Sequence, residues 1–278
     1  MEDTIITTYY LCEEFLRATA HRDDPQVVLS IAEVMTTVVA AAAFFGGNIE
    51  ASRSFLDEYG YIDKAISKSR FNRRLHAIKS DLWKTLFDLL AEASASKTTL
   101  IKATWWTPCQ WPCARTSAST AVGSTLPKKA PERSEATSRA SGATSTACGG
   151  ASCGERGRQK PVEFALEASS EADVAVFKDL ELELPEGSII FADKGYTDYD
   201  YEDLLEEVGL HLKAQRRKNS KRPMPAWEEF LGKPIRRYIE TIFSRLRSLF
   251  PKKIHAVTPR GFELKIVCFL LAFSIQCL

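Results

Sequence analysis

The sequence predicts a helical amino-terminal region followed by an α/β unit, with a segment between them that fits neither pattern. Residues 1–93 carry helix-capping signals and apolar stripes, whereas beyond Lys160 short apolar strands alternate with helices. Between these parts both periodicities are lost. We therefore expect a helical region over 1–93, an aberrant and disordered segment over 94–160, and an α/β unit over 161–278.

Three helices in the amino-terminal region have clear boundary signals. Residues 24–45 begin with a capping Asp and a Pro at the first helical position, and they run apolar until Gly46–Gly47. Ser67 is placed to cap a short basic helix, KSRFNRRLH, and Ser80 or Asp81 to cap a more apolar one. These signals predict an all-helical unit that ends near Glu92.

The carboxyl-terminal part alternates between the two periodicities. Strands are expected in PVEFALE, GSIIFADKGY and LHLKAQ, and helices in SSEADVAVFKDLELEL, YEDLLEEVG and the segment from Ile235 to Phe250. Gly209 closes the second of these helices, and Pro251 stops the third. The loop RRKNSKRP, after the last strand, is strongly basic. Strands interleaved with helices indicate an α/β domain.

Composition and charge exclude several classes of protein. Charged residues make up 26% of the 278 residues, hydrophobic residues 45%, and the net charge is +1, so the chain is not basic overall. The start of the chain does not resemble a signal peptide, and the apolar run IVCFLLAFSIQCL near its end is too short to span a bilayer. We expect a cytoplasmic protein in which this run is a buried terminal helix.

The cysteines give only a weak signal. Seven cysteines without a secretory signal argue against a disulfide framework. Four of them fall in the middle segment and faintly resemble a zinc ribbon: Cys109, Cys113, Cys148 and Cys153. Their spacing departs from the usual Cys-x2-Cys and no histidine lies nearby, so a zinc site is the less favoured interpretation.

The middle segment lacks the residues of a core. From 111 to 160, Val122 and Leu126 are the only large aliphatic residues, and Phe, Tyr and Ile are absent. A disordered Ser/Thr/Ala/Gly linker is one interpretation, although a structureless insertion of about fifty residues is uncommon inside a compact domain.

A translated wrong reading frame is the interpretation that we favour over a linker. Trp105-Trp106-Thr107 must be encoded TGG TGG ACN, and reading one base earlier forces Val followed by Asp. The same frame permits the strand-like run Ser-Met-Pro-Val-Ala-Val under residues 107–113, and Lys-Arg-Arg-Tyr-Phe-Tyr-Gly under residues 141–147. One direction of shift thus gives plausible protein sequence at both places.

Two written carboxylates are candidate site residues. Asp193 follows a buried strand, where a carboxylate is more often a cap or turn residue. Glu240 lies on the apparent inward face of the long helix, where an ion pair with Arg236 or Arg237 is the more common role. Together with the forced hidden Asp, they form a set from two strands and a helix, which is what two magnesium ions about 4 Å apart require.

Four motifs occur in order along the chain: SKSRFNRRLH, GSIIFADKGYTDYDYEDLL, RRKNSKRP and RRYIETIFSRLRSLFPKKIHAVTPRGFELK. With these motifs the sequence resembles a bacterial insertion-sequence transposase of the DDE class, which has an RNase H-like catalytic core. The resemblance covers Thr4–Glu92 and Pro161–Ile275. It implies a mixed sheet with flanking helices, preceded by a helical DNA-binding region.

The resemblance assigns roles to individual residues. It implies Asp193 and Glu240 as the second and third metal-binding and catalytic carboxylates, and it places the first in the strand hidden under Trp106 and Thr107. Such transposases often carry Tyr-x2-Arg-x3-Glu-x6-Lys around the third carboxylate. Here Arg236 and Glu240 match, whereas Arg247 replaces the Lys and Lys233 the Tyr.

The activity and partners that the resemblance implies are also specific. Two Mg²⁺ ions would support nicking at a transposon end and transfer of the freed 3′ end to target DNA. The partners would be double-stranded DNA, as terminal inverted repeats and as target, and we expect a homo-oligomer on DNA, associated with the bacterial nucleoid and not with a membrane.

Two basic clusters are candidate DNA contacts. On the short helix, basic side chains suit entry into a major groove and an Asn can read a base edge: Lys68, Arg70, Asn72, Arg73 and Arg74. In and around the basic loop, and on the long helix, the candidates for phosphate contacts are Lys213, Arg216, Arg217, Lys218, Lys221, Arg222, Arg236 and Arg247. The alternatives are an ordinary exposed helix face and a solvated loop.

The chain as written is expected not to transpose DNA, because Thr107 stands where the family places its first carboxylate. Two alternatives remain open. One is a non-enzymatic DNA-binding remnant in which the helical half acts alone, and the other is an RNase H-like nuclease without strand transfer. Inverted repeats flanking the gene would favour transposition over both.

Overall fold

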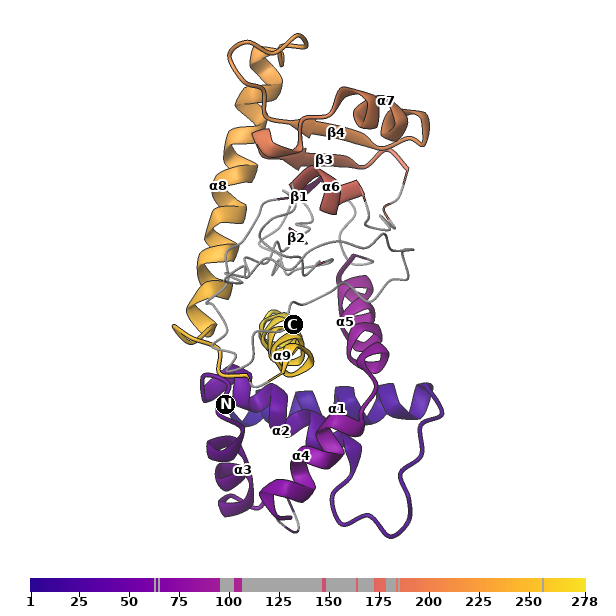
Figure 1. The fold of residues 1–278 in the computed structure, drawn as a ribbon, viewed down its shortest axis with the longest axis vertical. Helices are drawn as coiled ribbons and strands as arrows, with labels where there is room; N and C mark the ends of the chain where they lie inside the picture. The colour runs from indigo at the N-terminus through magenta and orange to yellow at the C-terminus, as the bar shows by residue number, and fades with distance from the viewer. Residues whose placement is uncertain are drawn as a thin grey trace, which may run out of the picture.

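The computed structural model describes residues 1–62, 64, 66–95, 103–106, 147–148, 164, 173–178, 184, 186–256 and 258–278 (Figure 1). The four-cysteine spacing lies outside these residues, except for the backbone of Cys148. Most of the segment 94–160 lies outside them too, so its predicted disorder stays a prediction.

The amino-terminal region is helical, as predicted. Its helices are α1 (Glu2–Ala18), α2 (Ile31–Phe44), α3 (Ile49–Glu58), α4 (Lys68–Ala77) and α5 (Ser80–Ala95). The Ser67 side chain accepts a hydrogen bond from the backbone N–H of Arg70, which confirms the predicted cap of the basic helix α4. Apolar faces of these helices meet in one buried cluster that includes Val34, Leu56 and Phe71.

The predicted start of α2 is wrong. The helix begins after Ser30, whose side chain accepts a hydrogen bond from the Glu33 N–H at 3.1 Å, while the Glu33 carboxylate accepts one from the Ser30 N–H at 2.6 Å. This reciprocal capping box outcompetes Asp24, which instead stabilises a turn by accepting a backbone hydrogen bond two residues further on. The predicted end is confirmed, because Gly46 and Gly47 adopt positive φ angles of 56° and 81° just after the helix.

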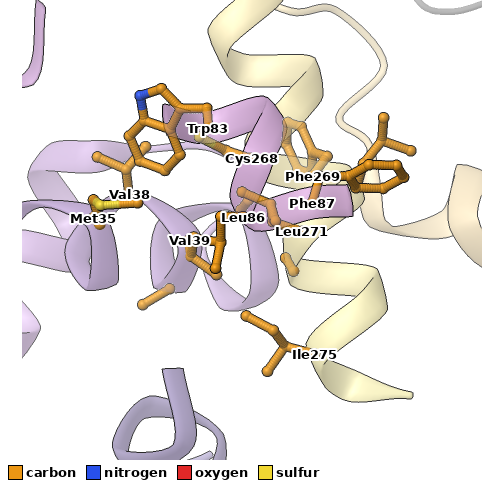
Figure 2. Packing of buried hydrophobic residues seen from close by; sticks show 14 of the residues in the cluster. Met35, Val38, Val39, Trp83, Leu86, Phe87, Cys268, Phe269, Leu271 and Ile275 are labelled. Carbon is orange, nitrogen blue, oxygen red and sulfur yellow. The ribbon is translucent and has the colours of Figure 1, made fainter. Parts of the chain in front are cut away.

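The apolar run at the end of the chain is a buried helix, α9 (Pro259–Gln276), as predicted. It packs against α2 and α5, so the last helix returns to the amino-terminal body. Figure 2 shows Phe269 and Leu271 of α9 close to Val39 of α2 and Phe87 of α5. We call α1–α5 with α9 the helical body.

No single helix in the described part of the chain is long and apolar enough to cross a membrane. Only α2 and α3 taken together reach that length and composition, and the chain bends by 111° between them.

A four-stranded mixed sheet lies beyond the helical body (Figure 1). Its strands are β1 (Ala103–Trp106), β2 (Ala147–Cys148), β3 (Ile189–Ala192) and β4 (His211–Ala214), in the order β2-β1-β3-β4. The strands β1, β3 and β4 are parallel, with Trp106 paired to Ala192 and Ala192 to Ala214, and β2 is antiparallel to β1. Strands were predicted where β3 and β4 lie, and both are confirmed.

Helices flank this sheet as an α/β unit requires. They are α6 (Asp173–Lys178), α7 (Tyr199–Glu207), which connects β3 to β4, and α8 (Ala226–Leu249). Gly209, with a φ of 78°, follows α7 where a stop was predicted. The strand predicted in PVEFALE lies outside the described residues apart from Phe164.

The predicted start of the long helix is wrong, because α8 begins at Ala226 rather than near Ile235. Pro234, a residue that usually ends or kinks a helix, lies inside α8. The helix instead continues through it and runs alongside the molecule from the sheet towards the helical body (Figure 1). Its buried residues Ile242, Phe243 and Leu246 join the cluster that includes the helical body.

Candidate active site

Asp193 lies at the carboxyl end of the buried strand β3. The strand residues Ile190 and Ala192 are fully buried, which fixes the chain up to the carboxylate. The Asp193 side chain itself is 29% exposed. Its backbone carbonyl accepts the N–H of Tyr196, so the chain turns away directly after the strand and leaves the carboxylate at the sheet edge.

Glu240 and Asp193 are brought together by one arginine on α8. The Arg236 guanidinium lies 2.9 Å from Glu240 through Nε and 3.6 Å from Asp193 Oδ1 through Nη1. Both nitrogens belong to one rigid planar group, so the two carboxylate oxygens lie within roughly 9 Å of each other. The predicted ion pair of Glu240 with Arg236 is therefore present, and it also includes Asp193.

Gln215, which the sequence interpretation missed, belongs to the same group. It directly follows β4, and its side-chain oxygen accepts a hydrogen bond of 2.8 Å from Arg236 Nη1. Its backbone N–H donates to the carbonyl of Ala192, the residue before Asp193. The strands β3 and β4 are parallel neighbours, so their carboxyl ends lie at the same edge of the sheet. The polar residue at the end of LHLKAQ could therefore have been predicted to lie near Asp193.

Asp193 and Glu240, with Arg236 between them, do not by themselves fit a two-metal site. Asp193 and Glu240 supply the hard oxygen ligands that Mg²⁺ prefers, but they are two residues and share a guanidinium. Within the described ranges, no cluster of three or more His, Cys, Asp or Glu side chains could hold a metal ion. Position 107, where the first carboxylate was expected, lies outside those ranges.

The six predicted phosphate-binding cations in and around the basic loop fall into two classes. Three of them are ion-paired: Lys213 with Glu228 at 3.1 Å, Arg216 with Glu202 at 2.6 Å, and Arg222 with Asp203 at 2.6 Å. The hydrogen bonds that Arg216 donates to the Glu202 carboxylate raise the pKa of Arg216 above its ordinary value. The other three are exposed, and none of them pairs with a described carboxylate: Arg217, Lys218 and Lys221.

A pocket of about 430 Å³ lies between the basic loop and the first turns of α8. Phe191 and Gly232 contribute apolar surface, and Lys194 and Gln215 connect it to the residues around Asp193. Its other lining residues include both ion-paired and exposed cations of the loop. A chain of phosphates passing Asp193 would therefore meet positive charge next to it.

The remaining predicted DNA contacts also differ in exposure and pairing. On α4, Lys68, Arg70, Asn72 and Arg73 are exposed, whereas Arg74 is half-buried and forms an ion pair of 2.7 Å with Asp23 on the segment before α2. Arg247 is exposed and lies two turns beyond Glu240 on α8, roughly 10 Å further along the helix axis.

Comparison with known families gives a match in this part of the chain. Residues 152–275 match the family model of the transposase DDE domain. This match supports a DDE-type transposase. No curated protein and no solved structure gives a significant match. The DDE match includes β3, β4, α7 and α8, and with them Asp193, Gln215, Arg236 and Glu240.

Proposed function

We propose that this chain is a DDE transposase with an RNase H-like core that has lost its DNA strand-cleaving and strand-joining activity, and that Asp193 and Glu240 are two of the three metal-binding carboxylates of the intact enzyme. One observation carries the proposal: Arg236 ties these two carboxylates together within a transposase DDE domain. The mixed order of the sheet, with an antiparallel strand outside three parallel ones, supports the proposed core.

The position of β1 supports a third carboxylate next to Asp193. Trp106 is the register partner of Ala192, the residue before Asp193. The Asp codon of the shifted frame begins with the last base of the Trp106 codon and continues into that of Thr107. An Asp encoded there would follow β1 at the same sheet edge, within reach of the other two carboxylates.

The chain as written lacks that carboxylate, and we propose that it does not cleave DNA. Two bound Mg²⁺ ions would supply activation of water or a 3′ hydroxyl and stabilisation of charge at the phosphate. With Asp193 and Glu240 alone, the written chain has an incomplete ligand set. We propose that 94–160 is a misread segment between a helical DNA-binding region at 1–93 and the remainder of the catalytic core at 161–278.

Double-stranded DNA is the proposed partner, bound by two surfaces. The exposed side chains of α4 would enter a groove of the inverted repeat, and the exposed loop cations would bind phosphates near Asp193. Assembly of two or more copies on DNA, and a bacterial nucleoid location, follow from the same proposal.

The experiment uses a restored chain in which the middle is translated one base earlier. Its substrate is a supercoiled plasmid that carries the DNA flanking the gene, and the readout is Mg²⁺-dependent conversion to open circles. Asp193→Asn and Glu240→Gln should each abolish nicking, because each removes a metal ligand. The control Glu207→Gln changes an exposed carboxylate at the end of α7 that does not line the pocket beside Asp193, and it should nick normally.

If either site variant nicks as fast as the restored parent, the assignment of that carboxylate is wrong. If the restored chain binds the plasmid flanks without nicking them under any metal condition, the non-enzymatic DNA-binding alternative is favoured instead.

A further inference from the structure

The loop of residues 215–222, between β4 and α8, is tied to α7 near both of its ends. At one end, the Arg216 guanidinium donates two hydrogen bonds of 2.6 Å to the Glu202 carboxylate, and both side chains are largely buried. At the other end, Arg222 donates two hydrogen bonds, of 2.6 and 2.9 Å, to Asp203. Bidentate pairs of this kind fix orientation as well as distance, so the loop is held as a preformed arch.

Tyr199, the first residue of α7, is the contact that the two ends share. Its ring faces both guanidinium groups, with Arg216 at 5.3 Å and Arg222 at 5.0 Å from the ring centroid. Its hydroxyl oxygen lies 2.7 Å from Ser220 Oγ, within the loop. One side chain therefore contacts three positions of the arch, and cation–π contacts add to the ion pairs.

The tied arginines are not available to DNA in the same way as their neighbours. Arg216 and Arg222 each donate two hydrogen bonds to a carboxylate. Arg217 and Lys218, which lie between them, are exposed and form no ion pair within the described part of the chain. Arg217 and Lys218 also line the pocket beside Gln215.

The pocket has a net positive charge once its ion pairs are considered. Its carboxylates, Glu228 and Glu229, are paired with Lys213 and Lys233. The charge that is not compensated by a described partner comes from Arg217, Lys218 and the nearby Lys194. An anionic strand that lies over the pocket would meet these cations first.

We propose that Tyr199 is a positioning residue that holds loop 215–222 so that Arg217 and Lys218 bind the phosphates of the DNA strand beside Asp193 and Glu240. This inference rests on the proposed DNA function and makes it more specific, because it divides the basic loop into anchoring and DNA-binding cations. A preformed loop binds with a smaller loss of conformational entropy than a loose one, so the anchor raises affinity without touching DNA.

The first test measures binding of a labelled duplex of mixed sequence to the full written chain over a series of salt concentrations. Arg217→Ala and Lys218→Ala should each reduce the slope of log affinity against log salt by about one, because each removes a phosphate contact. Lys253→Ala is the matched control, since Lys253 is an exposed cation beyond the far end of α8, and it should keep the parent slope.

The same assay separates positioning from contact. Tyr199→Ala should lower affinity by about tenfold at every salt concentration while leaving the slope almost unchanged, because the cations remain but the loop is no longer ordered in advance. Tyr199→Phe retains the ring against both arginines and should restore most of the affinity. Parent affinity for Tyr199→Ala, or parent slopes for both cation variants, would overturn the inference.

The second test needs no DNA. Trypsin cleaves after Arg and Lys, and an anchored loop resists it; Tyr199→Ala should therefore speed cleavage after Arg217 and Lys218 relative to sites in the helical body, as measured by mass spectrometry. Equal acceleration at all sites would mean general destabilisation and contradict a positioning role. Faster loop cleavage combined with no duplex binding by the parent at low salt would instead show that the anchor exists and that the proposed DNA function fails.

Discussion

Truncating Leu270 on α9 should loosen the amino-terminal helices, although they are far from it in sequence. Leu270 is fully buried, at 0% exposure, in the cluster that joins α9 to α2 and α5. A Leu→Ala change at such a site removes the side chain's burial and leaves a cavity, at a cost of about 3 kcal/mol. Since about 1.4 kcal/mol corresponds to a factor of ten, the opening equilibrium of the helical body should rise by roughly a hundredfold.

Hydrogen exchange read out by mass spectrometry measures this effect separately for each helix. With Leu270→Ala, the slowest amides of α2 and α9 should both exchange roughly a hundredfold faster, because the two helices share one core. Leu204→Ala is the control: Leu204 is 54% exposed on α7, and its removal should change exchange in the helical body by less than about threefold. Faster exchange in α9 with no change in α2 would refute the shared core and show that the amino-terminal helices are stable alone.

Two further predictions concern side chains outside that core. Arg70→Ala should weaken duplex binding without changing the melting temperature, because Arg70 is exposed. Arg74→Ala should instead lower the melting temperature, because it removes the ion pair with Asp23. An unchanged melting temperature for Arg74→Ala would contradict this structural role. The hydrogen bond from Arg222 lowers the pKa of Asp203 below its ordinary 3.8, so the stability that this pair contributes is present above that pH and is lost as the pH falls through the lower folded value. Asp203→Asn should accordingly flatten the acid side of a plot of melting temperature against pH, and an unaltered plot would show that the pair contributes nothing.

Much of the fold could be predicted because the local signals and the tertiary packing agree. Ser67 caps α4, and the glycine pair ends α2 at the predicted place. Boundaries failed where two local signals competed. Asp24 and Ser30 both resemble helix caps, and only the reciprocal bond with Glu33 decides between them. Pro234 is a helix breaker in isolation, yet α8 passes through it.

The candidate site was only partly predictable, because sequence patterns do not show which charges pair. Asp193 and Glu240 stood out by their places after a strand and on a helix face. The sequence does not show that Arg236 holds both carboxylates or that Gln215 joins them. These contacts depend on the register of β3 and β4. Arg216 resembles its neighbour Arg217 in the sequence, but only the fold places a buried carboxylate opposite it.

The most direct test of the central claim compares the written chain with the restored chain in Mg²⁺-dependent nicking of a supercoiled plasmid carrying the DNA that flanks the gene. Both proteins contain Asp193, Glu240 and the same loop, and they differ only in the middle segment that would supply the first carboxylate and its strand. We expect the restored chain to convert the plasmid to open circles and the written chain to leave it supercoiled. Equal nicking by the two would contradict it, because the middle segment as written would then support the complete reaction.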